Sequence, residues 1–111
     1  MFLNRCAITL TPKAPYIAWA NSLDSEGGRY EDGPDDEGEP VFLGPEVEQV
    51  DDARAFVLAN FDFFFETYLE MWWLDAADRP ESRTAEMFQE WFDVTISSMV
   101  EDVMDEPLIL E

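Results

Sequence analysis

The chain has 111 residues, of which 26 are Asp or Glu, 6 are Lys or Arg and none is His, so its formal net charge at pH 7 is -20. This excess of negative charge repels nucleic-acid phosphates and anionic lipid, and it favours a cationic partner, a metal ion or a high-salt medium. An apolar fraction of 47% with 14% aromatic residues excludes a disordered acidic tail, and the length fits a single domain covering residues 1–111.

The N-terminal segment predicts a strand within the first ten residues. Cys6, Ile8 and Leu10 share one face, and Pro12 ends the strand because proline lacks an amide hydrogen. The single cysteine excludes an intrachain disulfide and a cysteine-based metal cluster, and its place in an apolar strand predicts a buried, inert thiol. The chain has neither the apolar core of a signal peptide nor the roughly 20 apolar residues of a membrane span, so we expect a soluble, cytoplasmic protein.

A short helix and a long loop are expected next. The helix has Pro15 in its first turn and ends near Asn21. Residues 24–39 are dense in Asp, Glu and Gly, a composition typical of an exposed acidic loop. The loop fails the test for an EF-hand: with Gly38 at the sixth position, the twelfth position falls on Gly44 instead of a bidentate Glu.

The middle of the chain predicts a second strand and a long helix. Residues 40–45 form an apolar run between two prolines, which suits a strand at the edge of a sheet. No Gly or Pro interrupts residues 50–74, so one helix is predicted there. Because this helix is apolar on most of its circumference from Phe61 onward, we expect a second subunit to cover part of it in a homodimer. Its aromatic residues predict core or dimer interface rather than a cage for a cationic ligand: Phe61, Phe63, Phe64, Phe65, Tyr68, Trp72 and Trp73.

The last helix is predicted from an N-cap at Thr84 to about Met104. Its polar face would extend about 22 Å at a rise of roughly 1.5 Å per residue, and it would carry four acids: Glu86, Glu90, Asp93 and Glu101. No basic residue follows Arg83, so we interpret this face as a candidate surface for a basic protein, with carboxylates spaced in a way that resembles nucleic-acid phosphates. A simply solvated acidic face is the commoner cause of such a charge run. The apolar tail at residues 108–110 suits either docking on the core or contact with a partner.

The sequence lacks the residues on which most enzymes depend. It has no His, no glycine-rich phosphate loop, no G-x-S-x-G motif and no metal-ligand spacing. We therefore predict a noncatalytic protein with no cofactor and no metal site. Arg5 and Lys13 are candidate contacts for an anionic ligand, although an internal ion pair is favoured for Lys13 in a chain so rich in acid.

Three stretches carry a resemblance to other sequences. They are the run Asn-Arg-x-Ala-Ile-x-x-Thr-Pro-Lys-x-Pro at residues 4–15 with Trp19 following, the segment at residues 41–46, and Trp91-Phe92 leading to residues 98–100. Together they resemble a group of short bacterial proteins of uncharacterised function, over most of the chain except residues 24–39, which are richer in Gly and acid. The resemblance implies a bacterial, cytoplasmic origin and a shared compact fold, and it implies no activity.

These patterns together predict an α+β fold with two short strands, a small helix between them and two long C-terminal helices packed on the sheet. The predicted function is a noncatalytic acidic protein-interaction module for a basic partner, with no nucleic-acid or membrane partner. The alternative is a module that binds a small molecule or cation through Arg5 and Lys13 or through an aromatic pocket. A concave pocket that contains either cation would favour this alternative.

Overall fold

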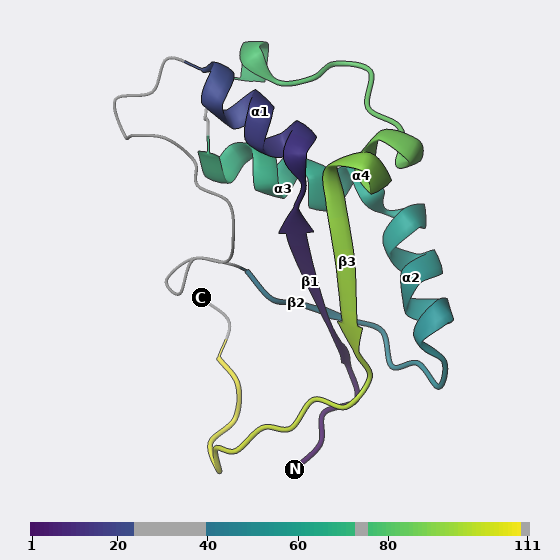
Figure 1. Ribbon diagram of the computed structural model, residues 1–111. Helices are drawn as coiled ribbons and strands as arrows, with labels where there is room; N and C mark the ends of the chain where they lie inside the picture. Colours follow the sequence, from purple (N-terminus) through teal and green to yellow (C-terminus); the bar gives the residue numbers. More distant parts are fainter. Residues whose placement is uncertain (24–39, 73–75, 110–111) are drawn as a thin grey trace.

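The computed structural model describes residues 1–23, 40–72 and 76–109, and its α+β class confirms the predicted one (Figure 1). Three antiparallel strands form a sheet in the order β2-β1-β3: β1 (Cys6–Pro12), β2 (Phe42–Gly44) and β3 (Phe92–Ser97). The helices are α1 (Ala14–Ser22), α2 (Val50–Ala59), α3 (Phe61–Trp72) and α4 (Ala85–Trp91), with a single 3-10 turn, η1, at Ala76–Asp78. The predicted acidic loop at residues 24–39, Trp73 and Leu110 lie outside the described residues.

The N-terminal half of the fold agrees with the sequence prediction. Cys6, Ile8 and Leu10 are buried on one face of β1, and the thiol of Cys6 is free. Pro15 lies in the first turn of α1. Among the described strands, β2 pairs with β1 alone and is the predicted edge strand. It comes so close to β1 that a Cβ atom at Gly44 would lie 2.7 Å from Cδ1 of the buried Ile8, so a larger residue would require the core to shift.

The prediction of a single helix over residues 50–74 is wrong, because the helix is interrupted at Asn60. The backbone amide of Asn60 donates to the carbonyl of Phe56 at 3.1 Å, and its side-chain amide donates to the same carbonyl at 2.9 Å. An Asn side chain that competes for helical acceptors in this way ends a helix. The break lets α2 lie beside β3 while α3 crosses the end of the sheet (Figure 1).

The long last helix is also wrong, and with it the count of two strands. α4 ends at Trp91, and the next residues form β3, which pairs with β1 from Pro12 opposite Phe92 to Ala7 opposite Ser97. The run Phe-Asp-Val-Thr-Ile-Ser alternates apolar and polar residues and contains three β-branched residues in succession, which favours a strand. The same residues also fit a helical apolar stripe, and pairing with β1 decides between the two patterns.

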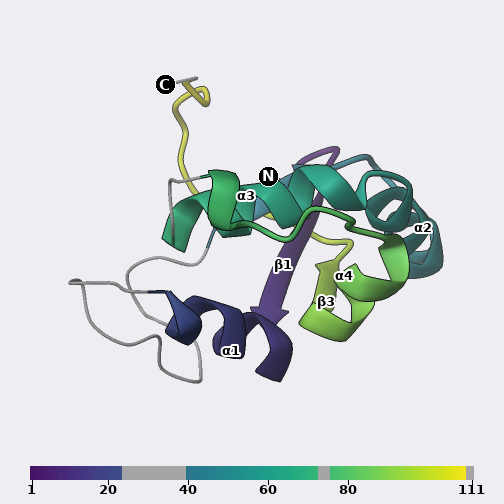
Figure 2. The same cartoon turned by 90° about the horizontal axis from the view of Figure 1, so that it is seen from above.

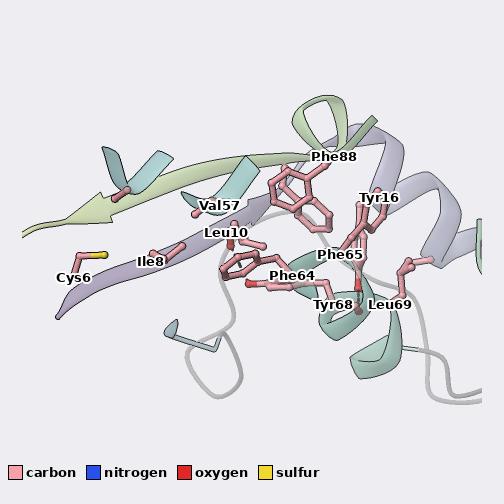
Figure 3. Packing of buried hydrophobic residues seen from close by; sticks show 13 residues of the cluster. Cys6, Ile8, Leu10, Tyr16, Val57, Phe64, Phe65, Tyr68, Leu69 and Phe88 are labelled. Atoms are coloured by element: carbon pink, nitrogen blue, oxygen red, sulfur yellow. Dashed lines mark hydrogen bonds between the residues drawn. The ribbon is translucent and has the colours of Figure 1, made fainter. Parts of the chain in front are cut away.

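Six of the thirteen buried residues of the core are aromatic. Most of these rings lie at the end of the sheet where α1, α3 and α4 meet, an arrangement of helices that Figure 2 shows from above. Figure 3 shows the rings of Tyr16, Phe65, Tyr68 and Phe88 gathered there, while Cys6 lies toward the other end of β1. Two buried hydroxyls connect the layers: that of Tyr16 donates to the carbonyl of Tyr68 at 2.8 Å, and that of Tyr68 donates to the carbonyl of Leu10 at 3.0 Å. These bonds tie α1 to α3 and α3 to β1 inside the apolar cluster.

Candidate functional site

Two arginines that the sequence analysis did not single out neutralise one side of α3. Arg79 pairs with Glu66 and lies 3.9 Å from a carboxylate oxygen of Glu70. Arg83 donates to Asp62 at 2.7 Å, and its guanidinium lies over the ring of Phe65. The hydrogen bond from Arg83 holds the pKa of the Asp62 carboxyl below its usual value. These pairs fasten residues 79–83 onto α3 and have a structural role.

The two cations proposed as anion contacts lie at opposite ends of β1. Lys13 donates from Nζ to the carbonyl of Gln89 at 3.0 Å and lies 3.5 Å from Oδ1 of Asp93, so the predicted internal ion pair is confirmed. Arg5 donates to the carbonyl of Asn4 beside it and is exposed. Eight residues of extended chain span about 26 Å, so the two cations do not belong to one site.

The four acids expected on one helical face lie on three separate segments. Glu86 and Glu90 are exposed on α4, Asp93 lies on β3 in the ion pair with Lys13, and Glu101 lies opposite Phe2 in an isolated β-bridge. A continuous row of carboxylates along about 22 Å of helix therefore does not exist. The spacing that resembles nucleic-acid phosphates is limited to Glu86 and Glu90, one turn apart.

The acids nearest the C-terminus belong instead to what we call the terminal surface, residues 1–3 together with residues 99–109. The amide of Leu3 donates to the carbonyl of Val100 at 2.7 Å, and the amide of Asp102 donates to the carbonyl of Met1 at 2.8 Å. These bonds hold the two segments side by side at the end of the sheet opposite α1, α3 and α4 (Figure 1). Tertiary pairing therefore builds a surface from the two most distant parts of the sequence.

The terminal surface combines negative charge with exposed apolar side chains. Its carboxylates are the exposed Glu101, Asp105 and Glu106 and the half-buried Asp102. Its large apolar side chains are each more than half exposed: Met1, Phe2, Met99, Val103, Met104, Leu108 and Ile109. A groove of about 560 Å³ runs between the two segments, and no Lys or Arg side chain lines it. Such a surface can accept apolar side chains that are flanked by positive charge.

The aromatic residues of α3 mostly serve the core, as predicted. Phe64, Phe65 and Tyr68 are buried and contact other aromatic rings. Phe63 differs because 63% of its surface is exposed, although its ring packs edge-on against Phe42 of β2. The described rings that would form a cation cage are thus largely packed against aromatic rings of other elements.

The chain matches no protein-family model, no curated protein and no solved structure. In the part of the chain that the structure describes, none of the helices combines the length and the apolar character needed to cross a bilayer. Among residues 1–23, 40–72 and 76–109, no three Cys, Asp or Glu side chains are arranged to hold a metal ion.

Proposed function

We propose that the protein is a noncatalytic interaction module whose terminal surface binds a basic, amphipathic segment of a partner protein. The observation that carries this proposal is the interleaving of acids with exposed apolar side chains along residues 99–109, which contain no basic side chain. Single exposed apolar residues are normal on a protein surface, but apolar residues gathered along a groove and rimmed by one sign of charge are typical of an interaction site.

The two kinds of side chain on this surface contribute differently to binding. Carboxylates attract and orient a cationic partner, which chiefly raises the association rate and adds specificity. Burial of the apolar side chains supplies affinity, at about 25 cal/mol per Å² of apolar surface removed from water. Met1, Met99 and Met104 add adaptability, because an unbranched thioether side chain packs against many shapes.

Of the four acids that the sequence nominates, only Glu101 lies on the terminal surface. Glu86 and Glu90 are exposed on α4, at the other end of the sheet from the terminal surface. Their charges add long-range attraction for a cationic partner. Asp93 is engaged by Lys13 and contributes less. The partner is therefore expected to contact residues 99–109 first.

A second copy of the chain is the competing occupant of the terminal surface, although the homodimer predicted from the sequence was expected to cover the helix from Phe61 onward. Two copies would bring surfaces of the same sign together, which opposes association. A cationic partner gains from the same charges, and we favour it for that reason. The bacterial origin implied by the resemblance and a cytoplasmic location remain predictions.

The test uses a synthetic peptide with Lys and Leu at helical spacing and a second peptide in which Ser replaces every Leu. Binding is measured by fluorescence anisotropy at low and moderate salt. We expect the Lys-Leu peptide to bind at least about tenfold more tightly than the Lys-Ser peptide, and salt to weaken both. Equal affinity for the two peptides would reduce the interaction to nonspecific charge attraction and overturn the proposal.

Three triple variants locate the site. Replacing Val103, Met104 and Leu108 by Ser removes apolar groups and keeps the charge, and D102N/D105N/E106Q removes three charges from the terminal surface. The matched control E46Q/E48Q/D52N removes three exposed charges near the start of α2. We expect both terminal variants to weaken binding of the Lys-Leu peptide about tenfold and the control to change it by less than about threefold. A control as damaging as the terminal variants would contradict the proposed site. Sedimentation velocity distinguishes a second copy from a cationic partner. If the wild-type protein is a dimer and the apolar triple variant is a monomer, the terminal surface would be assigned to self-association.

A further inference from the structure

A second concave site, separate from the terminal surface, lies where α2 meets the junction of α4 and β3. It is a groove of about 230 Å³. Apolar side chains from α2 and β3 contribute to its lining: Val57, Leu58, Phe92 and Val94. Three polar residues also line it: Arg54, Gln89 and Asp93. Drug-sized ligands usually occupy about 300 to 1,000 Å³, so this groove suits a smaller molecule.

Arg54 differs from three of the other cations whose surroundings the structure describes. Lys13, Arg79 and Arg83 each have a carboxylate partner within 4.0 Å. Arg54 has none among residues 1–23, 40–72 and 76–109, although the chain contains 26 acids. Its Nη1 donates to the backbone carbonyl of Val94 at 2.8 Å, which positions the guanidinium at the groove. A guanidinium has five N–H donors, so most of them remain for a ligand.

The opposite charge in the groove comes from Asp93. Lys13 holds this carboxylate at 3.5 Å from its Nζ and also donates to the carbonyl of Gln89, another lining residue. A cationic residue and an anionic residue therefore line the groove beside four apolar residues. Leu58 and Val94 are half-buried, whereas Val57 and Phe92 are almost inaccessible to solvent.

We propose that this groove binds a small zwitterion with an apolar tail, an α-amino acid of the size of leucine. A guanidinium recognises a carboxylate through two parallel hydrogen bonds, so Arg54 receives the carboxylate of the ligand. Asp93 receives the ammonium group, and the tail packs against Leu58 and Val94. The net charge of -20 repels a simple anion, whereas a zwitterion carries no net charge and is not repelled. This proposal rests on different residues from the terminal surface and stands or falls independently of it.

Three ligands that share one apolar tail separate the contributions of the two charges. L-leucine carries both groups, 4-methylpentanoate lacks the ammonium group, and 3-methylbutylamine lacks the carboxylate. Titration is followed by the backbone amide NMR signals of residues 54–58 and 89–94. For leucine we expect a dissociation constant on the order of 1 mM, as suits so few atoms. Binding should weaken several-fold for the acid and about tenfold or more for the amine. Amine binding as tight as leucine binding, or no shift with leucine at saturating concentration, would overturn the proposal.

Variants test the assigned residue. Arg54→Met should weaken leucine binding at least about tenfold, and Arg54→Lys, which keeps the charge and loses the fork geometry, should weaken it by a smaller factor. The matched control is Arg5→Met, because Arg5 is also a described arginine without a carboxylate within 4.0 Å. It should leave leucine binding unchanged. Asp93→Asn should abolish the preference for leucine over 4-methylpentanoate. Equal effects of Arg54→Met and Arg5→Met, with native spectra for both, would contradict a specific role for Arg54.

Discussion

The two ends of the sheet both contain large apolar residues, but these residues differ in solvent exposure. At the end where β1 meets α1, large apolar side chains such as Phe65 and Phe92 are almost inaccessible to solvent. At the other end, Met1 and Val103 expose 91% and 85% of their surface. The difference arises because three helices converge on the first end and pack over its side chains, whereas two extended segments form the second end (Figures 1 and 2). Apolar composition therefore leads to burial only where other elements supply the opposing surface.

Charge follows the same division. Next to the aromatic core, Arg79 and Arg83 neutralise acids of α3. The terminal surface contains no Lys or Arg, and its carboxylates surround apolar side chains. Arg79 and Arg83 thus serve the packed end of the sheet. On the terminal surface, the N-terminal ammonium group of Met1 lies 3.8 Å from a carboxylate oxygen of Glu101, and the other three carboxylates have no ion pair among the described residues.

The largest expected effect on the free energy of unfolding tests the role of burial by neighbouring elements. Phe65→Ala removes a ring that is 0% exposed and contacts Phe88 and Phe92, so we expect a loss of about 3–5 kcal/mol in the free energy of unfolding. Phe63→Ala, two residues away on the same helix and 63% exposed, should cost less than about 1.5 kcal/mol. Urea unfolding followed by Trp fluorescence measures both. Equal losses would show that exposure does not separate the two positions.

An intermediate effect is expected for the buried hydroxyl of Tyr68. Tyr68→Phe removes the donor to the carbonyl of Leu10 in an apolar surrounding, and we expect a loss of about 1–2 kcal/mol. The control is Thr9→Val, on the same strand as Leu10. It removes a longer, solvent-accessible hydrogen bond to the carbonyl of Thr95 at 3.4 Å. It should change the free energy of unfolding by less than about 0.5 kcal/mol, since surface substitutions usually do. Thermal or urea unfolding at neutral pH provides the comparison, and a Tyr68→Phe protein as stable as wild type would argue against a structural role for this bond.

The smallest effect concerns charge and depends on pH. The folded-state pKa of Asp62 is lowered by Arg83, so the pair stabilises the fold above the ordinary carboxyl pKa of about 4 and loses its effect as the pH falls below it. Asp62→Asn should therefore cost up to about 1 kcal/mol at pH 7 and progressively less at a pH below about 4, as the lowered folded-state pKa is approached. Glu106→Gln on the terminal surface should be neutral or slightly stabilising at pH 7, because it removes an exposed acid from a chain of net charge -20. Urea midpoints at pH 7 and at a pH below about 4 would contradict this prediction if the cost of Asp62→Asn stayed constant.

Several elements were predictable because their signals are local. The alternation of Cys6, Ile8 and Leu10 predicts a strand with one buried face, and proline at the start of a helix or beside an edge strand restricts the backbone directly. The break at Asn60 also had a local signal, since Asn competes for helical acceptors, but an uninterrupted run of helix-compatible residues obscured it.

The candidate sites were less predictable. The excess of acid after Arg83 was plain from the sequence and indicated a cationic partner. The sequence placed these acids on a helix face, whereas in the structure Glu101 lies on the terminal surface. The reason is its pairing with Phe2, almost a whole chain length away. Arg54 gave no signal at all, since its position at a groove depends on how α2 packs against β3.

By itself, the sequence determined the charge, the α+β class, the buried face of β1 and the aromatic character of the core, because composition and nearest-neighbour periodicity control these properties. Only the tertiary structure decided whether residues 92–97 form a helix or a strand, which acids are neutralised, and where acids and apolar side chains meet. In the ladder between β1 and β3, Thr9 pairs with Thr95 across 86 positions of sequence. Local patterns were compatible with either structure there, and the free energy of pairing with a distant strand selected one of them.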